Sequence, residues 1–270
     1  MAAKSKQMPD AMKAKAYGTT SIGLLFLLWI LSTSAFGLID LRTLPSPMMV
    51  IERFALLIAD PFSGATIFGH ALASLTRWGG GVLLAIALGI PTGILFAQAP
   101  VFRVLAKPVF ELLHYVPPFA WVPIAVLWFG ASTFTQQMVV FVAAFPAIVI
   151  NTQLGVAHID KIMFDAAKVF GAGQGAILRR VVIPGAAPSI YTGIRIAVSN
   201  GWMALVGAEL VVGKVGLGFL ISQGQQNLSV STIFVGIISI GVLGVLIDTA
   251  IQRSEGFVMP WRSHTSGQQE

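Results

Sequence analysis

Long stretches without charge constrain this chain more than any other feature of its sequence. No residue from Trp78 to Phe102 carries a charged side chain, and the same holds from Val215 to Ile247. A helix needs ~20 consecutive apolar residues to cross the hydrocarbon core of a bilayer, and these stretches are long enough. Only 10% of the 270 residues are charged while 56% are hydrophobic, a balance that a soluble domain does not show. We therefore expect an integral membrane protein.

Hydropathy predicts an all-α, polytopic fold with six transmembrane helices. These lie at 18–39, within 70–98, and at 115–130, 136–157, 189–212 and 232–252. The first run is longer than the ~7–15 apolar residues of a signal peptide, so we interpret it as an uncleaved span. The third contains Pro117, Pro118 and Pro123, which a membrane helix tolerates where neighbours satisfy the carbonyls that proline leaves free.

The distribution of basic residues predicts that both termini are cytoplasmic. In that orientation the outside segments hold only Arg42, Arg53 and Lys214, whereas the inside segments hold most other Lys and Arg residues, including Arg103 and Lys107. This bias follows the positive-inside rule. It accounts for the net charge of +6, so no nucleic-acid partner is expected. The predicted domains are a cytoplasmic tail at 1–17, a membrane domain at 18–252 and a cytoplasmic tail at 253–270.

Small residues recur at every fourth position of the second span. They are Gly81, Ala85, Gly89 and Gly93. This spacing places them on one helical face, where a second helix can approach closely. The strip serves either as a sliding seam in a moving transporter or as a site of static helix packing.

Glu209 lies within an apolar part of the fifth span, next to Ala208 and Leu210. An ionisable residue inside a membrane is costly, so it is expected to face the bundle interior or a water-filled path. It either contacts a transported solute or holds a gate through hydrogen bonds. Arg195 and Asp248 lie near span ends, where each can extend to the interface as an anchor.

Sequence patterns of enzyme sites are absent. The chain has no His-Glu-x-x-His, no Gly-x-x-x-x-Gly-Lys and no Gly-x-Ser-x-Gly motif. It has no cysteine, and His70, His114, His158 and His264 lack the spacing of metal ligands. Gly216 and Gly218 follow no predicted strand, so they indicate a loop. We expect no metal, no cofactor and no covalent chemistry on this chain.

The only substantial cytoplasmic loop spans residues 158–188. Its sequence predicts a short helix, a glycine break, a second amphipathic helix and a re-entry into the membrane marked by Pro184 and Pro188. Ala166 and Ala167 leave a narrow helix surface that fits a groove on a partner, and Gly171 allows the backbone to reverse. The alternative is an ordinary loop that lies on the membrane surface.

The order of residues in this loop resembles the coupling-loop signature of binding-protein-dependent ABC permeases. That signature is Glu-Ala-Ala, three residues, Gly, nine residues, and Ile-x-Leu-Pro. Asp165-Ala166-Ala167, Gly171 and Val181-Val182-Ile183-Pro184 keep its spacing, with Asp in place of Glu and Ile in place of Leu. Further motifs resemble those of permeases for nitrate, taurine and alkanesulfonates: His70-x-x-x-Ser74-Leu75-x-Arg77, Pro117-Pro118-x-Ala120-x-x-Pro123, Ala208-Glu209 and Gly216-Leu217-Gly218.

The resemblance implies the permease subunit of a type I ABC importer, in a bacterial cytoplasmic (inner) membrane. In that family a second permease copy, expected as a homodimer, and two ATPase subunits form the transporter. A periplasmic or lipid-anchored binding protein delivers the solute, here a sulfonate, taurine, nitrate or similar small molecule. ATP and Mg would bind the ATPase, which must be a separate polypeptide because the tails of this chain are short.

The resemblance also implies roles for individual residues. Asp165, Ala166, Ala167, Gly171 and Pro184 would couple the ATPase to the membrane domain. As a separate hypothesis, we expect the substrate pathway or gate to lie near Pro117, Pro118, Trp121 and Glu209, on the third and fifth spans. The alternative is an ion-coupled secondary transporter, which acidic residues at mid-membrane would favour. Glu209 is the one residue that hints at it.

Overall fold

The computed structural model describes residues 10–35 and 39–259, and most of these residues lie in helices. The one β interaction in this part of the chain is an isolated bridge between Phe62 and Ala65. The helices are α1 (Asp10–Ile30), α2 (Pro47–Ala59), α3 (Ile67–Gln98), α4 (Pro100–His114), α5 (Val122–Phe129), α6 (Thr133–Ala157), α7 (Lys161–Val169), α8 (Gln174–Ile177), α9 (Ile183–Val212), α10 (Leu217–Gln226) and α11 (Val230–Val258). Short π-helical segments η1 (Leu31–Ala35) and η3 (Leu178–Val182) and the 3₁₀ turn η2 (Pro118–Trp121) join some of them. The all-α prediction is confirmed.

Five segments are long and apolar enough to cross a membrane. They are Tyr17–Ser34, Ile67–Gln98, Thr133–Ala157, Gln174–Val212 and Val230–Gly256. A sixth span exists if the bent pair of α4 with η2 and α5 counts as one. The predicted spans at 70–98, 136–157, 189–212 and 232–252 each fall within one of these helices.

The third expected span has a different shape from the prediction. Residues 115–130 do not form one helix, because the chain bends by 95° between α4 and the helical segment that starts at Pro118. Pro117 is extended, with φ −55° and ψ 136°, as expected for a residue that precedes a proline. The segment 100–114, predicted as a cytoplasmic connection, is the helix α4 instead.

Parts of both predicted tails are helical. α1 begins at Asp10 and α11 continues to Val258, so helical residues extend into both segments that were predicted as tails. The remaining tail residues, 1–9 and 260–270, lie outside the described residues, as do residues 36–38 near the end of the first predicted span.

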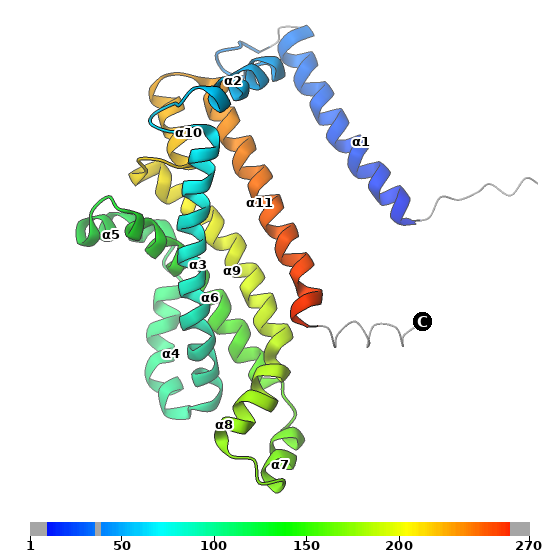
Figure 1. The fold of residues 1–270 in the computed structure, drawn as a ribbon, viewed down its shortest axis with the longest axis vertical. Helices are drawn as coiled ribbons and strands as arrows, with labels where there is room; N and C mark the ends of the chain where they lie inside the picture. The colour runs from blue at the N-terminus through cyan, green and yellow to red at the C-terminus, as the bar shows by residue number, and fades with distance from the viewer. Residues whose placement is uncertain (1–9, 36–38, 260–270) are drawn as a thin grey trace, which may run out of the picture.

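The centre of the bundle consists of α3, α6 and α9 (Figure 1). α3 and α6 run parallel, because Gly81 lies against Val140 and Gly93 lies against Thr152 further along both helices. Ala85, between these levels, is 0% exposed. α9 runs antiparallel to α6, since Gly201 lies against Val140 while Gly155 lies against Ser189.

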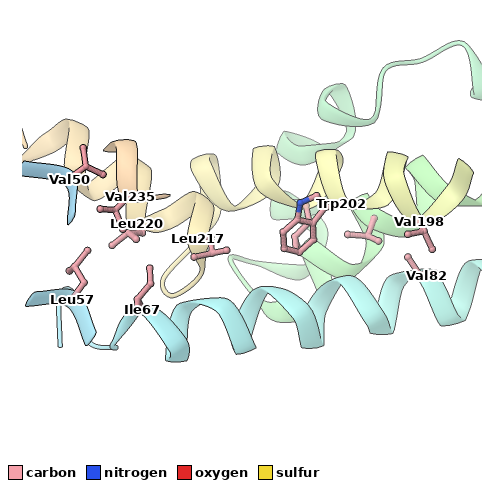
Figure 2. Packing of buried hydrophobic residues seen from close by; sticks show 11 residues of the cluster. Val50, Leu57, Ile67, Val82, Val198, Trp202, Leu217, Leu220 and Val235 are labelled. Carbon is pink, nitrogen blue, oxygen red and sulfur yellow. The ribbon is translucent and has the colours of Figure 1, made fainter. Parts of the chain in front are cut away.

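A separate apolar cluster joins this centre to α2, α10 and α11 (Figure 2). Trp202 of α9 lies in its middle and donates its indole N–H to the Ile240 carbonyl at 3.2 Å. The cluster also contains buried side chains of four other helices, namely Val50 and Leu57, Ile67 and Val82, Leu217 and Leu220, and Val235. This packing places α10 against the ends of α3 and α9.

α1 diverges from the bundle and approaches it at one end (Figure 1). At that end the Trp29 indole N–H donates to the Pro45 carbonyl at 2.9 Å, and its ring centroid lies 5.8 Å from that of Phe234. Most of the described side chains of α1 are exposed, including Leu25 and Leu27. Apolar side chains on such a helix suit a lipid environment.

Candidate functional site

α7 forms a short, well-capped helix at one end of the bundle. Asp160 caps it, because its Oδ1 accepts the Ile162 amide hydrogen at 3.0 Å. Phe164 and Ala167 pack on a buried cluster that contains Ile177 and Val182. The inner face of α7 is therefore attached to the segment that leads into α9.

The outer face of α7 exposes apolar side chains that nothing in the described chain covers. Val169 is 84% exposed and Phe170 89% exposed, and Ile162 and Met163 are exposed as well. Ala166 lies on the same open side. A cluster of this kind on a short helix is typical of a surface that binds another protein.

Gly171 ends α7 through a Schellman motif. The Ala172 amide donates to the Ala167 carbonyl and the Gly171 amide to the Lys168 carbonyl, both at 2.9 Å. The motif requires a left-handed residue, and Gly171 has φ +75°. Glycine adopts this conformation without the steric cost that a side chain brings.

The other predicted coupling residues lie close to α7 but differ in their contacts. Asp165 is exposed and pairs with Lys168 at 4.0 Å, a separation at which a surface ion pair contributes little. Pro184 lies in the first turn of α9 and is also exposed.

The re-entry into the membrane that was predicted at Pro184 and Pro188 does not interrupt the helix. α8, η3 and α9 follow one another without interruption from Gln174 to Val212. Within η3 the Ile183 amide donates to the Leu178 carbonyl, five residues back. Pro184 has no amide hydrogen, and the helix passes through this residue in the tolerated first-turn position of α9. From Gln174 onward, the coupling loop and the fifth span thus form one continuous helical rod.

Glu209 lies near the opposite end of this rod and is fully buried. Its carboxylate accepts hydrogen bonds from Ser74 Oγ at 2.9 Å, from Arg77 Nη1 at 2.9 Å and from the Gly218 amide at 3.0 Å. The Glu209 side chain is 0% exposed and that of Arg77 12% exposed. This ion pair connects α9 to α3. The hydrogen bond from the Gly218 amide connects Glu209 to the start of α10.

Two more side chains of α3 hold the same loop. Ser74 Oγ accepts the Leu217 amide at 2.9 Å, and His70 Nδ1 accepts the Gly216 amide at 3.0 Å. His70 Nε2 donates to the Phe62 carbonyl at 3.0 Å, which fixes the neutral tautomer with its proton on Nε2. Arg77 Nη1 also donates to the Val215 carbonyl. His70, Ser74, Arg77 and Glu209, with the loop 213–218, are called the carboxylate clamp below.

Gly216 and Gly218 of this loop are required by the space and the backbone conformation at their positions. Gly216 has φ +139°, and a Cβ at this position would overlap the Glu209 carboxylate. A Cβ on Gly218 would collide with the Val206 carbonyl of α9. The expectation of a loop role in place of nucleotide binding fits this arrangement.

Of the predicted pathway residues, only Pro118 lines an open cavity. This cavity of about 290 Å³ lies between α4 with η2, α6 and α9. Its walls include His114, Pro118, Phe119, Pro146, Asn200 and Met203. Trp121 lies nearby in η2, and its indole N–H is buried without a partner. Glu209 is not part of the lining, since the clamp encloses it, so the structure does not bring the four residues together.

Sequence reasoning found the members of the clamp separately but not their assembly. His70, Ser74 and Arg77 are spaced i, i+4 and i+7, which indicates one helix face. Glu209 lies more than a hundred positions away, and no local pattern predicts that it meets this face. Asn200 and His114 were missed because a single polar residue carries no motif.

Together, the apolar spans, the exposed apolar face of α7 and the clamped polar loop are typical of a multi-pass membrane transport subunit. The chain belongs to the family described as "Binding-protein-dependent transport system inner membrane component", whose profile matches residues 85–258. It is therefore a permease subunit of an ABC importer.

Its relatives and a solved fold agree with this assignment. The chain is 34% identical to the taurine transport system permease protein TauC of Escherichia coli (strain K12), over 90% of both chains. It is 33% identical to the nitrate import permease protein NrtB of Synechocystis sp., covering 89% of this chain and 88% of the relative. It is 36% identical to the bicarbonate transport system permease protein CmpB of the same organism, covering 87% and 85%.

Among solved structures, the fold matches a chain of the MetNI methionine ABC transporter in an inward-facing conformation. The TM-score is 0.62 at 17% identity, covering 77% of this chain and 98% of the MetNI chain. At this level of identity the match supports the fold alone.

Proposed function

We propose that α7 docks against an ABC ATPase subunit and receives the movement that ATP binding causes there. The observation that carries this proposal is the exposed apolar surface of Ile162, Val169 and Phe170 on a helix whose other face is packed. ATP and Mg belong to the ATPase, of which two copies are expected. Asp165, Ala166, Ala167, Gly171 and Pro184 shape or flank this contact.

The remaining partners follow from the family. A second copy of this chain completes the membrane domain, as a homodimer, and a periplasmic or lipid-anchored binding protein delivers the solute. The transporter lies in the bacterial cytoplasmic membrane, with α7 and both termini on the cytoplasmic side. Arg179 and Arg180 follow α7 at this end, which supports that orientation.

The solute pathway passes the cavity between η2, α6 and α9. The uncovered face of α9 beside it carries Thr192, Ser199 and Asn200. Polar side chains on a membrane helix avoid lipid, so this face turns toward the second copy and an aqueous path. His114 and Asn200 offer hydrogen-bond donors and no acidic residue belongs to the described lining. A small polar or anionic solute, such as a sulfonate or nitrate, fits this lining.

An ion-coupled mechanism has little support from the described residues. Its one candidate, Glu209, is paired with Arg77 and enclosed. A carboxylate that is neutralised by a fixed guanidinium is poorly suited to bind and release a coupling ion in each cycle.

The coupling assignment is tested with two matched glycine variants. Gly171 has φ +75° and Gly173 has φ −72°, and neither has an atom within 4 Å of an added Cβ. A valine is strained at position 171 and relaxed at position 173. We expect Gly171→Val to insert normally but to lose ATPase co-purification and ATP-dependent uptake, while Gly173→Val keeps both. Wild-type co-purification and uptake in Gly171→Val would reject the assignment.

A further inference from the structure

We propose that the carboxylate clamp transmits movement from α7 to the opposite face of the protein, with Glu209 as a positioning residue and not as a solute ligand. This proposal rests on the proposed coupling role of α7. It assigns a function to a buried ion pair that the docking surface and the solute cavity leave unexplained.

The first step is the continuous helical rod between the two ends. Residues 174 to 212 form α8, η3 and α9 without a break. At ~1.5 Å per residue the helix from Gln174 to Glu209 is about 50 Å long, measured along its axis. α7 packs on the start of this rod through Phe164 and Ala167, and Glu209 is near its end. A displacement of α7 therefore moves Glu209 with it.

The second step is how Glu209 holds the loop beyond α9. The amides of Gly216, Leu217 and Gly218 donate to His70, Ser74 and Glu209 respectively. The carbonyl of Val215 accepts from Arg77. The backbone of this loop is therefore fixed by side chains of α3 and α9, and α10 begins within it at Leu217. When α9 and α3 move, the loop and α10 must follow.

The Glu209 carboxylate is too enclosed to bind a solute. Glu209, Ser74 and His70 are each 0% exposed, and a single added carbon on Gly216 would overlap the carboxylate. The carboxylate oxygens already accept bonds from three groups. No described cavity reaches them, so a transported solute has neither space nor a free hydrogen-bonding group here.

The test uses the absence of cysteine in the chain. Lys214 is an exposed residue of the clamped loop, so Lys214→Cys provides a single thiol for a water-soluble maleimide. In the full transporter with its ATPase, we expect the labelling rate of this thiol to change when a non-hydrolysable ATP analogue is added. In Glu209→Gln the change should be lost, because the amide cannot form the charged pair with Arg77.

Transport is measured on the same variants. Glu209→Gln should retain ATPase co-purification and basal ATP hydrolysis but lose uptake by about 5- to 150-fold, the usual range for coupling between sites. Asp248→Asn is the matched control, since it removes a half-exposed ion pair. In this pair Arg195 Nε lies 3.3 Å from Asp248 Oδ1. The uptake and the nucleotide response of Asp248→Asn should equal those of the wild type.

Each result separates the clamp from other roles. If Glu209→Gln is too unstable to purify, Ser74→Ala removes one donor while the ion pair stays, and it should weaken the nucleotide response in part. A wild-type response in both variants overturns the proposal. An altered KM with an intact response makes Glu209 a solute contact and also overturns it. If the labelling rate of Lys214→Cys does not change with the ATP analogue even when Glu209 is intact, the coupling role of α7 is refuted instead.

Discussion

Gly81 of α3 and Val140 of α6 approach so closely that a Cβ on Gly81 would lie 2.6 Å from the Val140 Cβ. Two further levels repeat this contact, with Ile148 against Gly89 and Thr152 against Gly93. Sliding α3 past α6 would require side chains at all three levels to leave their recesses together. The strip of small residues therefore favours fixed packing, with α3 and α6 moving as one body.

The first prediction compares two glycines on α3. Gly81→Ala places a methyl group against Val140 and the Gln137 carbonyl, whereas an added Cβ on Gly79 has no atom within 4 Å. We expect Gly81→Ala to lower the free energy of unfolding by about 1–3 kcal/mol through overpacking. Gly79→Ala should be neutral or raise it by about 0.5–1 kcal/mol, because alanine favours helix. Thermal unfolding of the purified protein in detergent measures both.

Equal melting behaviour of the two variants would contradict the packing described for α3 and α6. The comparison is internal to one helix, so differences in detergent or expression affect both proteins alike.

The sequence predicted four of the spans well, because each consists of a long apolar run that only a helix can place in a bilayer. It misplaced the third for a reason visible in the same residues. α4 is amphipathic and carries Arg103 and Lys107, so its charges suggested a connection outside the membrane. Pro117 and Pro118 were interpreted as a tolerated interruption, whereas they cause a bend of 95°.

For the functional site, sequence reasoning reached the parts that are local. Asp165 to Gly171 lies within one short helix and its Schellman turn, so its residues could be matched to the coupling-loop signature that they resemble. The clamp and the solute cavity depend on contacts between distant segments, such as Ser74 with Glu209 or Phe119 with Gly207. Hydropathy gives the order of spans but not which of their faces meet, so it left open whether Glu209 contacts a solute or holds a gate through hydrogen bonds.

The second prediction concerns the face of α9 beside the cavity. Met203 is 62% exposed and lines the cavity, and Leu83 of α3 is 67% exposed outside it. In this cysteine-free chain we expect Met203→Cys to react with a membrane-impermeant thiol reagent in the assembled transporter. Leu83→Cys should react at least about tenfold more slowly, since a thiol in contact with lipid is rarely ionised. Labelling with a charged maleimide provides the measurement.

The solute should also protect the first of these thiols. Adding the transported molecule together with its binding protein is expected to slow labelling at position 203 and to leave position 83 unchanged. Faster labelling at position 83 than at 203 would place the aqueous path elsewhere.

The third prediction tests how η2 is held against α9. The ring of Phe119 occupies the space where a Cβ on Gly207 would be. Gly207→Ala should therefore displace the ring from the cavity wall and destabilise the protein. In Phe119→Ala the same alanine at position 207 finds free space. The two changes should be non-additive, with a coupling free energy of about 0.5–3 kcal/mol in a double-mutant cycle of thermal unfolding.

A control cycle pairs Phe119→Ala with Gly241→Ala on α11, where an added Cβ has no atom within 4 Å, and should be additive. Additivity in both cycles would mean that η2 does not pack on Gly207, and the wall assigned to the solute cavity would then have to be redrawn.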